Sequence, residues 1–179
     1  MLLFKKGLIF YDLEWTGQEL LQIGAVSYND DQEEGREFER TILTDNDIHF
    51  KVAETVLLET RLDKNGNRCV YDKRREKFLK SISLSEALQD FVEWIQTKYF
   101  KYGQIILVSH GSNDIPVLFT SLAKLDLDKL FLERITELFN FQDYLHQYFP
   151  DLPRSLSDLV KRVGSKQTYF FHSALGDAR

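Results

Sequence analysis

Residues 7–14 have the sequence GLIFYDLE, an apolar run that ends in two carboxylates one residue apart. Such a run is typical of a buried strand, and side chains alternate between the two faces of a strand. Asp12 and Glu14 therefore project to the same face. Two neighbouring anions repel each other and resist burial unless a cation lies between them. The segment predicts a core strand that ends in a divalent-metal site, although Asp-x-Glu pairs also occur by chance.

Two more strands are expected directly after this one. Residues 20–28 (LLQIGAVSY) are an apolar run, and residues 36–43 alternate well enough for a third strand. The polar residues 29–35 between them predict a turn. Strands joined by such short connections predict an antiparallel meander.

The second half of the chain alternates between strands and helices. Ser83 is followed three residues later by Glu86, a capping-box signature, and apolar residues repeat at helical spacing from there to about residue 98. Residues 104–109 are a continuous apolar run of the kind found in a central strand. Residues 114–124 predict a helix after it. A short strand at 139–141 and helical segments at 143–148 and 155–163 complete the pattern.

Residues 44–80 show little sustained periodicity. A structureless loop of this length is unusual in a compact domain, so we expect short helices or a hairpin here. The elements together predict an α/β fold, with a mixed sheet of three antiparallel strands and then two parallel ones, flanked by helices. We expect residues 1–179 to form a single domain that continues beyond residue 179 in the parent protein.

The bulk composition fits one globular domain. The 179 residues are 43% hydrophobic and 13% aromatic, which excludes a disordered chain. The single cysteine, Cys69, excludes an internal disulfide and a paired-thiolate zinc site. The apolar runs are too short to span a bilayer, and the charges of residues 5–6 follow the apolar residues, the reverse of a secretory signal. We expect no membrane contact and an intracellular protein, cytoplasmic or nuclear.

The net charge of −5 is unusual for a protein that binds nucleic acid. The basic residues are unevenly distributed, however, and either basic run can also be read as a solvated surface. If several carboxylates bind metal ions, part of the net negative charge is neutralised. One run comprises Lys73, Arg74, Arg75, Lys77 and Lys80, and the other comprises Lys161, Arg162 and Lys166.

A second motif, residues 108–118 (VSHGSNDIPVL), joins a buried strand to a helix. Asp114 begins the helix, which Ser112 or Asn113 can cap. The carboxylate of Asp114 either complements the helix dipole or contributes to the site of Asp12. His110, at the end of the strand, reads most simply as a structural histidine.

A third motif closes the sequence as residues 172–179 (HSALGDAR). Ala174 and Ala178 lie one helical turn apart and would let a short helix approach the sheet closely. Such an approach would bring Asp177 towards the carboxylates of the first strand. His172 alternatively is a surface residue at the start of that helix.

Together these motifs resemble the DEDDh family of 3′→5′ exonucleases. The likeness consists of the D-x-E pair, the aspartate of the middle motif and the closing H-x-A-x-x-D-A pattern. Residues 22–26 and 155–159 resemble flanking segments of the family. The matched positions are Asp12, Glu14, Asp114, His172, Ala174, Asp177 and Ala178.

The resemblance implies a ribonuclease H-like fold and a two-metal mechanism acting on single-stranded RNA or DNA. Two Mg²⁺ or Mn²⁺ ions would ready a water molecule and stabilise the leaving 3′ oxygen. The metal ligands would be Asp12, Glu14, Asp114 and Asp177, with His172 as general base. Trp15 and His110 are the candidate substrate-binding residues, and Trp15 either stacks on a base or packs against the protein.

Two other functions fit the same residues. One is a catalytically impaired exonuclease-fold module that binds RNA. The other is a protein-interaction domain with an acidic pocket that holds no metal. The sequence leaves open the choice between RNA and DNA, as well as the oligomeric state.

Overall fold

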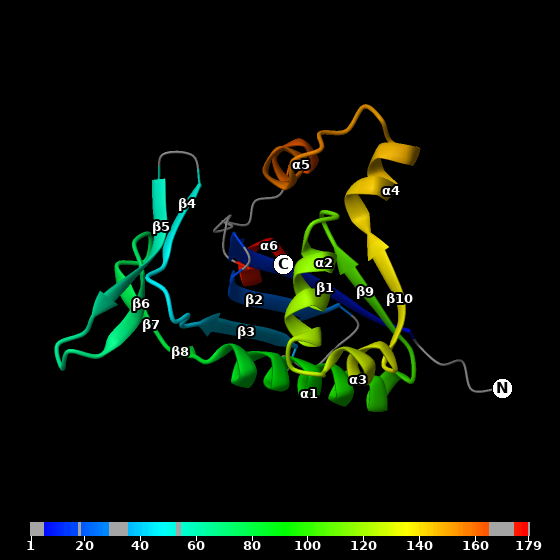
Figure 1. Cartoon of the computed structure of the whole chain (residues 1–179). Helices are drawn as coiled ribbons and strands as arrows, with labels where there is room; N and C mark the ends of the chain where they lie inside the picture. The colour runs from blue at the N-terminus through cyan, green and yellow to red at the C-terminus, as the bar shows by residue number, and fades with distance from the viewer. Residues whose placement is uncertain (1–5, 18, 29–35, 53–54, 165–173, 179) are drawn as a thin grey trace.

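A mixed sheet of six strands organises the chain, in the order β10-β9-β1-β2-β3-β8 (Figure 1). The computed structural model describes residues 6–17, 19–28, 36–52, 55–164 and 174–178. β1 lies inside the sheet, antiparallel to β2 and parallel to β9. β3 is antiparallel to β2, and β10 is parallel to β9. The strands are β1 (Gly7–Thr16), β2 (Glu19–Ser27), β3 (Glu37–Ile42), β8 (Ser81–Ile82), β9 (Ile105–Ser109) and β10 (Ile135–Asn140).

This topology confirms the mixed sheet of antiparallel and parallel strands flanked by helices. β8, which pairs in parallel with β3 at the sheet edge, was not expected because two residues carry no periodic signal. β10 begins at Ile135, four residues before the expected strand. The turn expected at residues 29–35 lies outside the described residues.

The strand register defines which side chains share a face of the sheet. Asp12 pairs with Gly24, and Gly24 pairs with Glu39. Two residues further along β1, Glu14 pairs with Gln22 of β2, which in turn pairs with Thr41 of β3. Paired residues point to the same side, so Asp12, Glu14 and Glu39 share one face. We call this the carboxylate face.

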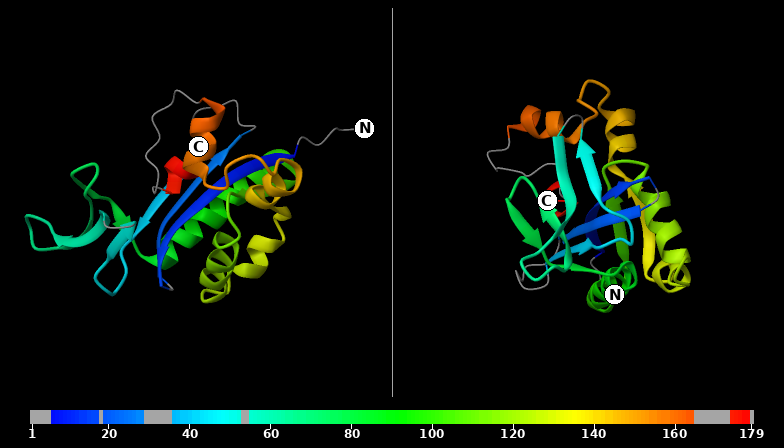
Figure 2. Two further views of the ribbon diagram at one scale, coloured as in Figure 1. Left: turned by 90° about the horizontal axis from the view of Figure 1, so that it is seen from above. Right: turned by 60° about the vertical axis from the view of Figure 1, so that its left-hand side comes forward.

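The opposite face is covered by helix α1 (Leu84–Tyr102) (Figure 2). Its capping box is present, since Ser83 and Glu86 bond to each other's backbone N–H groups. The helix runs four residues beyond the expected end and stops at Gly103, whose φ is 74°. Its apolar side and the core side of the sheet form the main core. The core includes Ile9, Tyr11, Leu13, Ile23, Ala87, Leu88, Phe91 and Ile95.

Five shorter helices complete the described chain. α2 begins at the end of β9, and α6 packs on the carboxylate face against β1 and β2. α3 was not expected, because its five residues are too few to show a helical repeat. The bounds are α2 (Asp114–Ala123), α3 (Asp128–Leu132), α4 (Phe141–Tyr148), α5 (Leu156–Val163) and α6 (Ala174–Ala178).

Strands β4, β5, β6 and β7 form a second, antiparallel sheet in that order, which projects beyond β3 (Figure 1). We call it the β-arm. Leu21 of β2 packs with Ile48, Leu58 and Val70 in a small separate core, which anchors the arm to the main sheet. The hairpin expected within residues 44–80 is confirmed, and the short helices are not. The strands are β4 (His49–Val52), β5 (Thr55–Leu62), β6 (Arg68–Asp72) and β7 (Lys77–Leu79).

The helices of the described ranges include none that is both long and apolar enough to cross a membrane. Even α1, with 19 residues, carries charged side chains along its length, including Glu86 and Lys101.

Candidate metal centre

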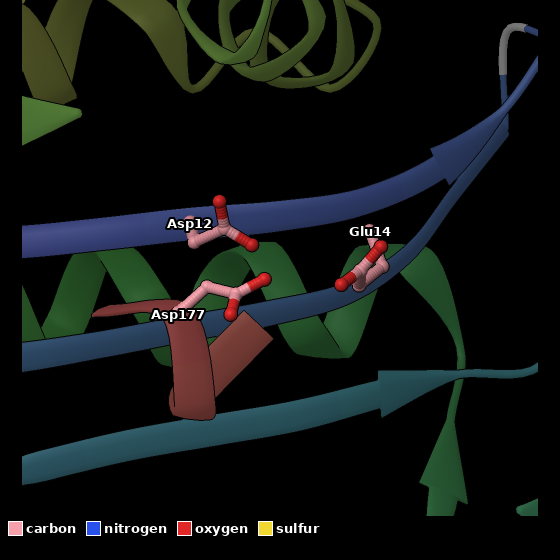
Figure 3. Close-up of side chains that lie close together, drawn as sticks. All are labelled: Asp12, Glu14 and Asp177. Carbon is pink, nitrogen blue, oxygen red and sulfur yellow. The ribbon is translucent and has the colours of Figure 1, made fainter. Parts of the chain in front are cut away.

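Three carboxylates from two distant parts of the chain meet on the carboxylate face (Figure 3). Asp12 and Glu14 come from β1 and Asp177 from α6, and one oxygen of each lies within 4.8 Å of the others. Ala174 and Ala178 are buried against the sheet, and Gly24 is the β2 partner of Asp12. These small residues allow the close approach of α6 that brings Asp177 to β1.

The fourth predicted ligand, Asp114, is the first residue of α2 and is 8% exposed. It is not a member of the group of three, yet its charge raises the pKa of Asp12 and of Glu14. The helix cap differs from the expectation. Asn113 is the N-cap residue, in a helical conformation, and makes no side-chain capping hydrogen bond. The start of α2 at Asp114 is therefore not capped by the side chain of Asn113.

Burial dominates the electrostatics of these carboxyl groups. It raises the pKa of Glu14 to about 8, with Asp177 adding to the rise and Arg74 opposing it. It raises the pKa of Asp114 to about 6, where a hydrogen bond from Trp15 opposes the rise. Without a cation, the ionised forms are unfavourable here.

Asp12 is central to the group. Burial raises its pKa well above the usual range, and Asp114, Asp177 and Glu14 each raise it further, in that order. The charges of all three other acidic residues therefore act on Asp12. A carboxylate in that position can be shared between two cations.

The two candidate substrate-binding residues have different neighbours. The indole of Trp15 lies close enough to the carboxylate of Asp114 to lower its pKa. His110 is half-buried and meets the ring of Phe141 edge-on, with the centroids 6.5 Å apart. Burial lowers the pKa of His110, and its Nε2 has no hydrogen-bond partner among the described residues.

A pocket of about 290 Å³ opens beside Asp177 on the carboxylate face. Its walls combine aromatic rings with a few polar groups, as in sites that bind planar ligands. The lining includes Phe10, Tyr28, Arg36, His110, Phe141 and Asp177. His110 therefore lies where a substrate could be held next to the carboxylates.

Sequence reasoning missed the position of Arg74. It was grouped with a basic run, but its charge is close enough to Glu14 to lower that residue's pKa. No local pattern indicates this, because Arg74 reaches Glu14 only through the placement of the β-arm. In the second basic run, Lys161 pairs with Asp158 at 3.2 Å.

His172, the expected general base, lies outside the described residues, as does Lys166. The described site thus contains Asp12, Glu14, Asp114 and Asp177 of the predicted catalytic set. Oxygen ligands of this kind suit hard divalent cations such as Mg²⁺ and Mn²⁺. A comparison of the chain with protein-family models finds no match, and a comparison with curated proteins finds none either.

Proposed function

We propose that this chain is a metal-dependent 3′→5′ exonuclease that hydrolyses phosphodiester bonds of single-stranded RNA or DNA. The observation that carries the proposal is the convergence of Asp12, Glu14 and Asp177 within 4.8 Å. Ionised carboxylates that are buried at such a short separation are unfavourable unless they bind cations. The resemblance of the sequence motifs to the DEDDh exonucleases supports the same conclusion.

The architecture supports a ribonuclease H-like fold as part of this proposal. Three antiparallel strands are followed by two parallel ones, and helices cover the sheet. The proposed ligands come from the first strand, from the helix after β9 and from α6. A fold of this class would therefore gather them from three points of the chain.

The donor set fits two divalent cations. Asp12 would be the shared ligand, because all three other carboxylates act on it. Glu14 and Asp177 would complete one site, and Asp114 the other. When bound, the two cations would stabilise the negative charge that develops during phosphodiester hydrolysis.

The remaining residues of the site would hold the substrate and move protons. Trp15 would orient Asp114 through its indole N–H. The pocket beside Asp177 would bind a nucleoside, since aromatic walls such as Phe10 and Phe141 stack on any base. His172 is proposed as general base, by the resemblance.

The test is digestion of 5′-labelled single-stranded RNA and DNA with Mg²⁺ or Mn²⁺. A ladder of products shortened from the 3′ end is expected, and Asp12→Asn and Asp177→Asn should remove it. Asp90→Asn is the matched control, because Asp90 lies on α1 and pairs with Arg40. A folded wild-type protein that trims neither substrate with either metal is not an exonuclease.

One observation favours a catalytically impaired module that binds RNA. Asp114 is not in the group of three carboxylates, and the neighbouring indole of Trp15 lowers its pKa. A site with one cation would bind the substrate strand without cutting it. Salt-dependent RNA binding with no shortening in the same digestion would identify this function.

A further inference from the structure

The face of the β-arm that points away from its small core carries a stack of three side chains. The guanidinium group of Arg61 lies over the ring of Tyr71, with its Cζ 3.9 Å from the ring centroid. The ring of Phe78, the register partner of Tyr71, meets it edge-on, with the centroids 5.2 Å apart. The neighbouring register pair, Val70 and Leu79, faces the small core instead. The stack therefore holds the ring of Phe78 in place without burying it.

Phe78 is open to a ligand. It belongs to β7, the edge strand of the β-arm, and 45% of its surface is exposed. It also lines a groove of about 400 Å³ whose walls come from β7 and from β3 of the main sheet. A ligand that lies in this groove would therefore contact the ring of Phe78.

Two lysines give this groove an excess of positive charge. The lining has two acidic residues, and each is paired with an arginine of the same lining. Asp90 lies 2.7 Å from Arg40, and Glu39 lies 3.9 Å from Arg75. The lysines of the lining are exposed and have no ion-pair partner among the described residues. They are Lys77 and Lys80, on either side of Phe78 in the sequence. A chain of net charge −5 thus has a locally cationic groove with an aromatic ring in its wall.

We propose that this part of the β-arm binds single-stranded nucleic acid, with a base stacked on Phe78 and phosphates bound by Lys77 and Lys80. An exposed ring beside a cationic groove is the arrangement by which proteins hold single strands of any sequence. An acidic peptide would also complement the lysines, but the exposed ring favours the planar bases of a nucleic acid. The inference rests on the proposed function, since the bound strand is the one whose 3′ end reaches the carboxylates.

The groove is close enough to the proposed metal ligands for one strand to reach both. Glu39, in the lining of the groove, is joined to Asp12 through their shared register partner Gly24. Two strand spacings are about 10 Å. The β-arm therefore binds the strand behind its 3′ end, and the scissile phosphate lies at the carboxylates.

The test is the binding of fluorescein-labelled oligo(dT) and oligo(U) in a chelator, where no metal-dependent cutting competes. Phe78→Leu should raise the Kd about 5-fold or more, because stacking on a base is lost. Phe78→Trp keeps a stacking ring, so its Kd should stay near that of the wild type. Phe100→Leu is the matched control and should leave the Kd unchanged, since Phe100 is 73% exposed on α1.

The salt dependence of the same binding tests the two lysines. Lys77→Gln and Lys80→Gln should each reduce the slope of log Kobs against log salt by about 0.7. Lys73→Gln is the control on the same arm, because Nζ of Lys73 lies 3.3 Å from Oε2 of Glu59. Its charge is engaged within the arm, so the slope should keep its starting value.

Equal Kd values for Phe78→Leu and Phe100→Leu would overturn the inference, as would equal slopes for the three glutamine variants. A Kd raised as much in Phe78→Trp as in Phe78→Leu would mean that the ring only supports the arm. Binding of a polyglutamate peptide in place of the oligonucleotides would assign the groove to an acidic protein partner and overturn it too.

The digestion with Mg²⁺ or Mn²⁺ separates this inference from the proposed function. If wild type trims the strands while Phe78→Leu and Phe100→Leu bind them equally, the inference fails and the exonuclease function stands. Binding that depends on Phe78, in a protein that trims neither strand, would instead remove the exonuclease function and leave the binding site.

Discussion

The indole of Trp15, at the end of β1, lies close enough to the Asp114 carboxylate, at the start of α2, to lower the pKa of that carboxyl. In a regular strand Trp15 would point away from the face that carries Glu14. The register between β1 and β2 shifts between Glu14 and Trp15, and such a bulge re-aims the side chain that follows it. The bulge thus allows Trp15 to pack against the core and still reach Asp114.

Replacing Trp15 with phenylalanine should weaken metal binding. The aromatic packing is kept and the N–H is lost, so Asp114 loses a donor that orients it and lowers its pKa. Loss of a partner that orients a metal ligand typically costs about 10–100-fold in affinity. Calorimetric titration with Mn²⁺ near neutral pH measures the change.

Trp94→Phe is the control for this substitution. Trp94 is the only other tryptophan, and it lies on α1 with its ring next to those of Phe38 and Phe91. Mn²⁺ affinity should not change in this variant. Equal affinities for Trp15→Phe and Trp94→Phe would contradict an orienting role for Trp15.

Asp177→Asn should stabilise the metal-free fold while removing metal binding. In the wild type, the ionised group of three carboxylates is mutually repulsive, and Asp177 raises the pKa of both Asp12 and Glu14. Removing about 1–2 kcal/mol of this repulsion would raise the Tm by roughly 2–8 °C for a chain of this size. Thermal melts at pH 8 in a chelator, and then with Mn²⁺, give both quantities.

Asp177→Asn should raise the Tm of the metal-free protein but remove the stabilisation by Mn²⁺. This combination distinguishes a metal site from an ordinary cluster of ion pairs. Asp90→Asn removes a half-exposed carboxylate that pairs with Arg40, so it should slightly lower the Tm and leave the Mn²⁺-induced rise intact. A lower Tm for metal-free Asp177→Asn would mean that Asp177 stabilises the fold by another interaction.

The metal-free protein should become less stable as the pH rises from about 5 to 8. Burial raises the pKa of Glu14 from 4.5 to about 8 and that of Asp114 from 3.8 to about 6. In this range the folded state holds protons that the unfolded state has released, so the free energy of unfolding falls with pH. The loss should be on the order of a few kcal/mol. Urea unfolding in a chelator at several pH values measures it.

His110, whose pKa is lowered by burial, opposes this trend only below about pH 6.5, and carboxylates elsewhere do not reverse it. The pKa values of Glu59, Asp63, Glu86 and Asp158 are lowered, by hydrogen bonds that outweigh their slight burial. Their stabilising effect is lost only as the pH falls below the ordinary carboxyl range. Saturating Mn²⁺ should flatten the decline between pH 5 and 8, and a decline that Mn²⁺ leaves unchanged would place its cause outside the site.

The main sheet could be predicted because its signals are local. Residues 7–14 and 104–109 are long apolar runs, and α1 has both a capping box and a helical repeat. Pairing β1 with β9 then needs only the rule that parallel strands are joined by a crossover containing a helix. The spacing of Asp12 and Glu14 on one strand likewise predicted that their side chains share a face.

The β-arm could not be predicted in the same way. Its core is four residues from distant segments, Leu21, Ile48, Leu58 and Val70. β7 has three residues and β4 four, too few for alternation to stand out. The effect of Arg74 on Glu14 depends on where this arm packs, and the approach of Trp15 to Asp114 depends on a bulge. Neither feature has a local sequence signal.

Asp72 should be the most sensitive position of the β-arm. Asp72→Ala leaves the backbone N–H groups of Arg74 and Arg75, and their two guanidinium groups, without their shared acceptor. Because Asp72 is 1% exposed, the free energy of unfolding should fall by about 2–4 kcal/mol. Asp72→Asn keeps an acceptor oxygen and should lose less. Urea unfolding compares the two variants with the wild type.

Asp63 provides a matched acceptor in the turn between β5 and β6. Its Oδ1 accepts the backbone N–H groups of Asn65 at 2.8 Å and Asn67 at 2.9 Å, in an exposed loop. Asp63→Ala should therefore destabilise the protein less than Asp72→Ala. In Asp72→Ala the Mn²⁺ affinity should stay within a few-fold of wild type, because the carboxylate ligands are on other elements. Equal losses of stability from the two substitutions would mean that the burial of Asp72 adds nothing to the strength of its hydrogen bonds and ion pairs.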